Sequence, residues 1–194
     1  MKTHSALRPA IVLLAAFSLL LGFGYPALVT GAAQALFPFQ ANGSIIKLGG
    51  RAVGSALLGE NFSGPGWFRS RPSATTPYPY NAEASAASNL GPSNPALRKA
   101  ADARAERLRA ENPESTGPVP ADLVTASASG LDPHISPAAA LYQVERVARE
   151  RKLPPETVRR LVLSSVEGRT LGILGEPRVN VLELNLALSR ISPI

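Results

Sequence analysis

The chain has 194 residues, of which 45% are hydrophobic and 18% charged, and its net charge is +6. An intrinsically disordered chain combines low hydrophobicity with high net charge, so composition excludes that class. The chain contains no cysteine, which excludes disulfide scaffolds, thiol catalysis and thiolate-bound metal centres built from its own residues. Its 16 glycines and 18 prolines predict frequent turns.

A long apolar run follows the first few residues. No charged residue stands between Pro9 and Ile46, and the densest part covers residues 10–36. A helix needs about 20 mainly apolar residues to cross the hydrocarbon core of a bilayer. The run therefore predicts one transmembrane helix over residues 10–36, preceded by a short tail over residues 1–9.

A cleaved secretory signal is the alternative to this anchor. Lys2 and Arg8 would form its basic region, and Ala33-Gln34-Ala35 has the small-x-small form of a cleavage site. The run is longer than the roughly 7–15 apolar residues of a signal core, which favours the uncleaved anchor. Because flanking cations tend to stay inside, Lys2 and Arg8 indicate a cytoplasmic amino terminus. We therefore expect a single-pass protein of the plasma (inner) membrane with the bulk of the chain outside the cytoplasm.

Residues 37–194 form the second predicted part, an extracytoplasmic α+β domain with 14 acidic and 18 basic residues. Residues 44–48 and 51–58 are predicted strands on either side of Gly49-Gly50. Residues 63–95 are rich in proline and glycine but also hold four aromatic residues, which favours an ordered loop over a linker.

Apolar spacing and capping residues predict four helices in the second half of the chain. The first covers residues 95–111 and the second residues 137–151. The third follows Pro154-Pro155 and carries its apolar face as far as Val166, and the fourth begins after the capping residue Asn180. Residues 170–175 are predicted to form a strand or turn. The predicted fold class is thus a small mixed α/β domain of the α+β type on a single amino-terminal membrane helix.

Catalytic and metal sites find little support in these residues. Asp132 and His134 are too few to hold a metal ion. Ser127 and Ser129 stand near them and complete the residue types of a hydrolase triad, but all four lie in one short stretch, whereas triad residues converge from separate parts of a fold. The G-x-S-x-G elbow and the glycine motifs of nucleotide sites do not occur in the chain.

Nucleic acid is also excluded as a partner. The helices predicted over residues 137–151 and from Pro155 could form a helix-turn-helix, but the excess of cations in the domain is modest and an exported domain meets no DNA. The residues by themselves predict an exported binding or assembly subunit. A membrane-anchored exported serine hydrolase or a stand-alone binding domain remains the alternative.

Several stretches form distinctive motifs. They are Val53-Gly54-Ser55, Gly66-Trp67-Phe68, Ser88-Asn89-Leu90-Gly91-Pro92-Ser93-Asn94-Pro95, Val119-Pro120-Ala121-Asp122-Leu123-Val124-Thr125-Ala126-Ser127, Ser129-Gly130-Leu131-Asp132-Pro133-His134-Ile135-Ser136-Pro137 and Gly175-Glu176-Pro177-Arg178-Val179-Asn180-Val181-Leu182. In this order, over residues 1–194, the chain closely resembles the C chain of the Kdp potassium-transporting ATPase (the KdpC family).

The resemblance implies a non-catalytic accessory subunit of an ATP-driven, high-affinity potassium uptake complex. The implied partners are a channel-like potassium-conducting subunit, a P-type ATPase subunit, a small membrane peptide subunit and the lipid bilayer. Such C chains are described as assembly factors and as catalytic chaperones that raise the ATP affinity of the ATPase subunit. ATP is thereby implied as a ligand, with Gln143 as the suggested nucleotide-binding residue, or it acts only through the ATPase subunit.

Two features of the residues qualify what the resemblance implies. Gln143 lies beside the apolar stripe of its predicted helix, which favours a packed glutamine, and an exported domain cannot touch cytoplasmic ATP. We therefore favour assembly and allosteric support over direct nucleotide binding. Ala86, Ala87 and Ala128 stand where the family usually has glycine, and alanine is costly there if the backbone needs a positive φ.

Overall fold

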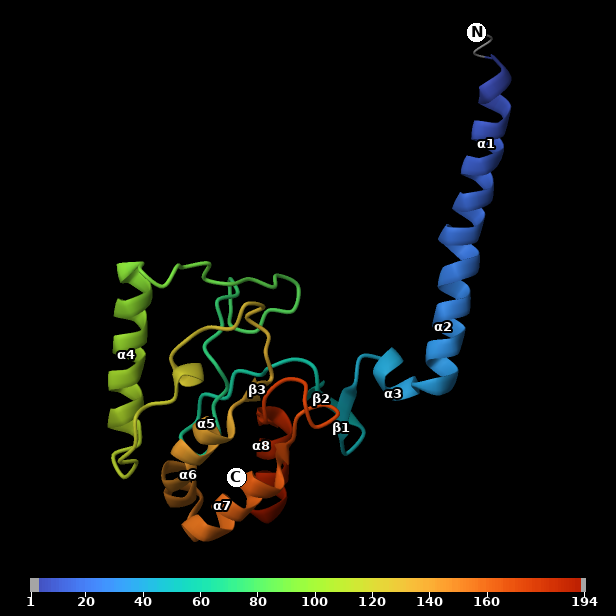
Figure 1. Cartoon of the computed structure of the whole chain (residues 1–194). Coiled ribbons are helices and arrows are strands. Elements are labelled where there is room, and N and C mark those ends of the chain that lie inside the picture. Colours follow the sequence, from blue (N-terminus) through green and yellow to red (C-terminus); the bar gives the residue numbers. More distant parts are fainter. Residues whose placement is uncertain (1–3, 193–194) are drawn as a thin grey trace. The chain divides into compact units, whose positions relative to one another are not determined.

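The computed structural model describes residues 4–192 and divides into two units, with the boundary between Ile45 and Ile46 (Figure 1). The elements in chain order are α1 (His4–Leu19), the π-helix η1 (Leu20–Gly24), α2 (Tyr25–Leu36), α3 (Pro38–Ala41), β1 (Ile45–Leu48), β2 (Arg51–Ser55), α4 (Pro95–Glu111), the 3₁₀ turn η2 (Ala121–Leu123), β3 (His134–Ile135), α5 (Pro137–Tyr142), α6 (Val144–Arg151), α7 (Pro155–Ser164), β4 (Val166–Glu167), β5 (Arg178–Asn180) and α8 (Val181–Ile191).

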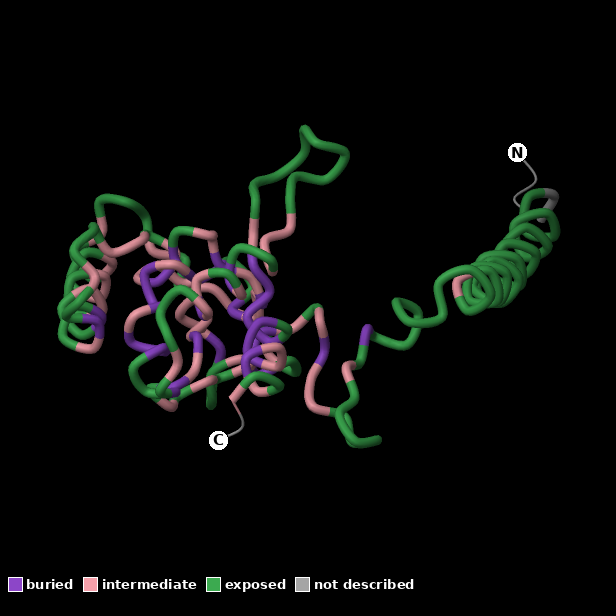
Figure 2. Tube along the Cα trace, turned by 90° about the horizontal axis from the view of Figure 1, so that it is seen from below, coloured by how far each residue is buried: buried purple, intermediate pink, exposed green. Residues whose placement is uncertain are grey.

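The first unit is dominated by one apolar helical run made of α1, η1 and α2. The most apolar 18-residue window within Ala6–Leu36 has a mean hydropathy of 2.1, and these residues are almost entirely exposed (Figure 2). At 1.5 Å per residue the run is about 46 Å long, more than the roughly 30 Å of a bilayer core. This is the only helix among residues 4–192 that is long and apolar enough to cross a membrane.

The π-helical segment has a local cause. Pro26 has no N–H to donate to the carbonyl four residues before it, so the regular ladder is interrupted there. The N–H of Tyr25 instead bonds the oxygen of Leu20, five residues back. Such a bulge lets the helix continue through a proline with most of its carbonyls satisfied.

The second unit contains two small antiparallel sheets. In the first, β1 and β2 are joined by Gly49 and Gly50, whose φ angles of 58° and 81° suit a tight hairpin. This confirms the two predicted strands on either side of Gly49-Gly50, although β2 ends at Ser55 instead of Leu58. The second sheet has the order β3-β5-β4, with Ile135 and Val166 both opposite Val179.

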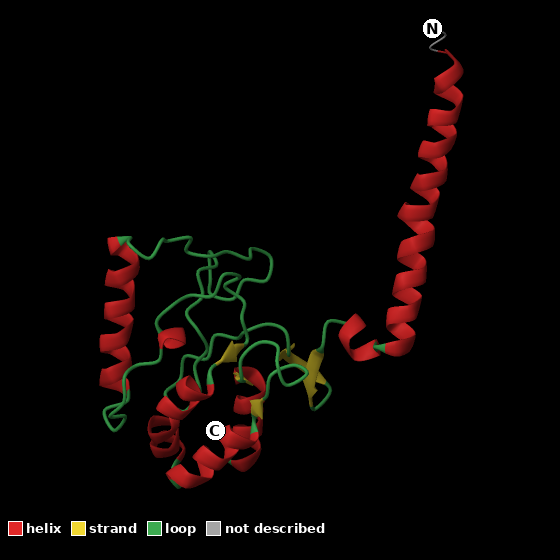
Figure 3. Ribbon diagram, in the orientation of Figure 1, coloured by secondary structure: helices red, strands yellow, loops and turns green. Residues whose placement is uncertain are grey.

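The core of the second unit lies where α5, α6, α7 and α8 pack together and against β5. Its fully buried aliphatic side chains include Val147, Val162 and Leu184, each with no exposed surface. The loop between β2 and α4 is long and irregular (Figure 3) but ordered, since Phe68 is completely buried in this core. The predicted ordered loop is therefore confirmed. Together with the helical run, this architecture confirms the predicted fold class.

Two helix predictions were wrong in part. The predicted helix 137–151 is broken at Gln143, whose N–H bonds the oxygen of Ala140, three residues back, in a tightened turn between α5 and α6. The predicted third helix ends at Ser164, because Val166 pairs with Val179 in the sheet. The pairing of Val166 is long-range, and the break at Gln143 coincides with side-chain hydrogen bonds to the distant Arg69, so helical spacing encodes neither feature.

The helix predicted over residues 95–111 has these bounds in the structure. The side chain of Asn94 accepts a hydrogen bond from the N–H of Ala96 and so caps α4. The cap on α8 is also present, since Asn180 Oδ1 accepts from the N–H of Glu183 at 3.2 Å. Residues 170–175 form a turn closed by a single bridge between Thr170 and Leu174.

The alanines that replace usual family glycines carry no left-handed strain. Within the part of the chain that the structure describes, the non-glycine residues with positive φ are Ser44, Tyr80, Asn89, Lys152 and Leu171. Ala86, Ala87 and Ala128 are not among them, so a methyl group at these positions meets no backbone penalty of that kind.

Candidate functional site

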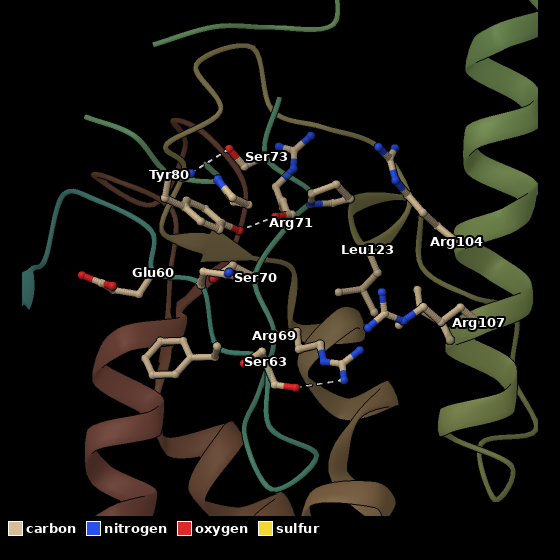
Figure 4. Close-up of a pocket in the computed structure, with 15 residues that line it drawn as sticks. Glu60, Ser63, Arg69, Ser70, Arg71, Ser73, Tyr80, Arg104, Arg107 and Leu123 are labelled. Carbon is tan, nitrogen blue, oxygen red and sulfur yellow. Dashed lines mark hydrogen bonds between the residues drawn. The ribbon is translucent and has the colours of Figure 1, made fainter. Parts of the chain in front are cut away.

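A cavity of about 340 Å³ opens between the loop of residues 60–80 and one face of α4 (Figure 4). Four arginines line it. Arg69 and Arg71 come from the loop, and Arg104 and Arg107 come from successive turns of α4. Its four arginines make this cavity the candidate site for binding chemistry.

The arginines of the cavity are held by the protein itself. Arg69 forms an ion pair with Glu111, and Arg107 Nε lies 2.8 Å from the other oxygen of that carboxylate. Arg104 Nη1 donates to the oxygen of Val124 at 2.8 Å. Although burial raises the pKa of Glu111, hydrogen bonds from Arg69 and Arg107 outweigh it and hold the pKa below its ordinary value. Glu111 thus joins the loop to α4.

Arg71 connects the cavity to the turn that contains Asp132 and His134. Its Nη1 lies 3.2 Å from Asp132 Oδ2, and the other oxygen, Oδ1, accepts the backbone N–H of His134 at 3.0 Å and lies 3.5 Å from its Nδ1. Burial raises the pKa of Asp132, but hydrogen bonds from His134 and the charge of Arg71 outweigh burial and lower it overall. This carboxylate therefore stays ionised and holds the turn.

The hydroxyl groups at the cavity also bond the backbone. Tyr80 donates to the oxygen of Arg71, and Ser73 Oγ donates to the oxygen of Gly130 at 2.7 Å. Burial raises the pKa of Tyr80 to about 12, so its phenol is protonated at neutral pH. The cavity thus offers guanidinium groups and a neutral phenol. Such groups are suited to binding a ligand or to holding the loop of residues 60–80 in place.

The triad residue types considered for a hydrolase do not converge. Ser127 Oγ accepts the N–H of Gly130 at 2.8 Å, and Ser129 Oγ accepts the N–H of Leu131 at 3.1 Å. Both hydroxyls therefore shape the turn. Within residues 4–192, neither serine is hydrogen-bonded to His134, whose contact is with Asp132. The structure does not favour the hydrolase alternative.

Gln143, the residue suggested for nucleotide contact, lies directly behind the cavity wall and has no exposed surface. Its Oε1 accepts the N–H of Arg69 at 2.8 Å, and its Nε2 donates to the oxygen of Arg69 at 3.2 Å. Arg146 Nη2 donates to the same Oε1 at 2.8 Å. Gln143 thus fixes the backbone of a residue that lines the cavity but does not itself line it.

Asn185 on α8 fixes the backbone of Phe68, the residue before Arg69, in the same way. Its Oδ1 accepts the N–H of Phe68 and its Nδ2 donates to the oxygen of Phe68, both at 2.9 Å. Like Gln143, it is completely buried. We call Gln143 and Asn185 the amide clamp, because each carboxamide bonds both backbone groups of one loop residue as a neighbouring strand would.

Arg146 completes the support of this loop and is only 2% exposed. It donates to the oxygens of Pro65 and Trp67, to Asn112 Oδ1 at 3.1 Å and to Gln143 Oε1. Burial, with a smaller contribution from the nearby charge of Arg69, lowers its pKa to about 10. Arg146 remains a cation at neutral pH whose desolvation is offset by four acceptors.

A second arginine fastens the loop at Trp67. The guanidinium of Arg151 lies 4.2 Å from the centre of the Trp67 ring and its Nε donates to the oxygen of Gly66 at 2.8 Å. Residues 65–69 are therefore held by side chains of α6 and α8 and by Gln143, all more than 70 positions away in sequence.

Sequence reasoning missed most of these supports. Asn185 carried a detectable signal, since it stands four residues after Val181 and three before Leu188 on the apolar face of α8. No signal in the sequence shows that Arg146 is buried, because its neighbours Glu145 and Arg149 make the segment resemble a solvated helix face.

The fold and site define a chain in which one apolar helix of membrane-spanning length precedes a small α/β domain whose buried polar groups bond its own loop. The family model for the K⁺-transporting ATPase c chain (KdpC) matches residues 7–190. The chain therefore belongs to this family, whose members are subunits of a potassium-transporting ATPase complex.

Individual relatives agree with the family model. A potassium-transporting ATPase KdpC subunit of Sorangium cellulosum is 62% identical over 182 residues, which cover 94% of this chain and 96% of the relative. The corresponding subunit of Polaromonas naphthalenivorans is 61% identical over 188 residues, covering 97% and 96% of the two chains. That of Ralstonia nicotianae is 61% identical over 182 residues, covering 94% and 89%.

Proposed function

We propose that this chain is anchored in the plasma membrane by residues 10–36, with residues 1–9 in the cytoplasm and the domain of residues 37–194 outside. There it supports assembly of a potassium pump with a channel-like subunit, a P-type ATPase subunit and a small membrane peptide. It raises the ATP affinity of the ATPase subunit by conformational coupling. Support comes from the family, from the membrane-length helix and from the basic residues that precede it.

The observation that carries the coupling mechanism is the environment of Gln143. Its carboxamide is fully buried, and each of its polar atoms already bonds Arg69, Arg146 or Ala139. A nucleotide could reach it only after the loop of residues 65–69 had been displaced. Direct contact would therefore cost the hydrogen bonds of the loop, whereas coupling through a rigid domain costs none of them.

The amide clamp provides a matched pair of variants to test this mechanism. Gln143→Leu and Asn185→Leu each remove a buried carboxamide and leave one N–H and one carbonyl of the loop unbonded, at about 1–3 kcal/mol per group. In the purified complex we expect both variants to change the KM for ATP by a similar factor. An increase confined to Gln143→Leu, at equal loss of thermal stability, contradicts coupling and supports contact with the nucleotide.

A second measurement remains informative if either variant fails to fold. A photoreactive ATP analogue, added to the wild-type complex, should label the ATPase subunit and leave this chain unlabelled. Saturable labelling of this chain that unmodified ATP abolishes would overturn the proposed mechanism.

The proposed orientation has its own experiment. Protease added to right-side-out vesicles should digest residues 37–194, while inside-out vesicles should protect them until detergent is added. The opposite pattern would place the domain in the cytoplasm and make direct contact with ATP possible.

A further inference from the structure

The hairpin loop of residues 168–177, which we call the finger, is the most exposed apolar feature of the second unit that the structure describes. It connects β4 to β5 and is drawn in orange-red in Figure 1. Every one of its residues is exposed. Leu171, Ile173 and Leu174 are 84%, 74% and 56% exposed, and none of them belongs to the core.

The finger has a defined shape. Its base is the antiparallel pair of Glu167 with Arg178, and an inner bridge joins Thr170 to Leu174 through two hydrogen bonds of 2.9 Å. Leu171 and Gly172 adopt φ angles of 55° and 78°, a left-handed turn that presents the leucine at the tip. A non-glycine residue in this conformation is uncommon.

The charged residues of the finger and of the strand pair at its base form two ion pairs. Arg169 Nη2 lies 2.6 Å from Glu176 Oε2, and Arg178 Nη2 lies 2.8 Å from Glu167 Oε2. No charged residue of the finger is left over to attract an anionic surface. The finger thus exposes a small, neutral group of aliphatic side chains, and the charged residues below them are ion-paired.

The chemistry of the finger favours some binding partners over others. Insertion into a membrane surface relies on unpaired lysine or arginine with tryptophan or phenylalanine, which residues 168–177 do not provide. A stable dimer of this chain needs roughly 1,200–2,000 Å² of buried surface, far more than three side chains supply. A small contact suffices, however, between partners that a second attachment already holds together, because the effective concentration is then high.

On the proposed function, the membrane helix is that second attachment. We infer that the finger docks into an apolar pocket on the extracytoplasmic face of another membrane subunit of the potassium pump, with Leu171 and Ile173 as its anchors. The helix and the finger would then fix the domain at two points. This arrangement gives the domain a defined placement from which conformational changes can be transmitted.

The test compares two variants of the full chain, expressed with the other subunits and purified as the complex. Leu171→Ser/Ile173→Ser removes the two most exposed anchors, and Leu163→Ser on α7 is the control, since Leu163 is 54% exposed outside the finger. We expect the finger variant to be retained in the complex about tenfold less, or worse, because each anchor loses its apolar burial. The control should be retained like the wild type, and thermal unfolding of the isolated full chains should be unchanged.

Retention of the finger variant at the wild-type level overturns the docking inference while leaving the proposed function intact. Failure of the wild-type chain to purify with any pump subunit contradicts the proposed function itself. A photoreactive amino acid at position 173 identifies the occupant in the wild-type background. A cross-link to a pump subunit supports the inference, whereas cross-links to lipid alone or to a second copy of this chain overturn it.

Discussion

Arg146 is the buried charge on which the loop of residues 65–69 most depends, and Arg146→Met tests that dependence. Methionine replaces the aliphatic stem with similar volume but supplies no donors. Pro65 O and Trp67 O then lose their donor, and Asn112 Oδ1 loses the guanidinium Nε at 3.1 Å. Gln143 Oε1 keeps the N–H of Arg69 at 2.8 Å, so it is not orphaned.

The expected cost follows from these three acceptors. Each unsatisfied buried group costs about 1–3 kcal/mol. Together the three groups would cost about 6 kcal/mol. The variant regains the energy of desolvating the cation, several kcal/mol, so the net loss of unfolding free energy is about 2–4 kcal/mol. For a chain of this size that lowers the midpoint of thermal unfolding by about 10 °C.

Thermal unfolding of the full chain in detergent, followed by circular dichroism, measures this change. Arg149→Met is the matched control, because Arg149 lies on the same helix but its side chain is 43% exposed and pairs with Glu114 at the surface. We expect the control to unfold close to the wild type. Equal midpoints for Arg146→Met and the wild type would refute the dependence of the loop on Arg146.

Two further predictions concern the turn beside the cavity. Gly130→Ala should destabilise the chain by at least about 2 kcal/mol in denaturant unfolding, because φ is +68° there and a Cβ would meet the oxygen of Ala86 at 2.6 Å, while Gly91→Ala, in open space, should be nearly neutral. The pKa of Asp132 is lower in the folded chain than in the unfolded one, so its contribution is complete above about pH 4, the ordinary value, and is lost as the pH falls through the folded value. Thermal midpoints between pH 7 and pH 3 should fall in the acid range, and less steeply in Asp132→Asn; an equally steep fall would contradict this role.

Local signals predicted the elements whose ends are specified by neighbouring residues. The bounds of α4 follow from Asn94-Pro95 at its start and Asn112-Pro113 at its end, and the hairpin of β1 and β2 follows from Gly49-Gly50. Capping and turn preferences act within a few residues, so they can be read before the fold is known.

Elements shaped by distant partners were predicted less well. The break at Gln143 accompanies bonds to Arg69, 74 positions away, and Val166 left its predicted helix to pair with Val179. Helical periodicity is a property of one segment of the chain. It therefore cannot predict a competing hydrogen bond from a distant segment.

The sequence by itself determined the apolar helix, the α+β class, the absence of thiol chemistry and, through its motifs, the family. Those properties follow from composition and from spacings along the chain. Only the tertiary structure decided that Gln143 and Asn185 form a clamp, that Arg146 is a buried cation and that the finger displays its aliphatic side chains. The physical reason is that burial and hydrogen-bond partnership depend on which segments meet in space, and a polar residue in a helical pattern looks the same whether it faces water or closes a distant loop.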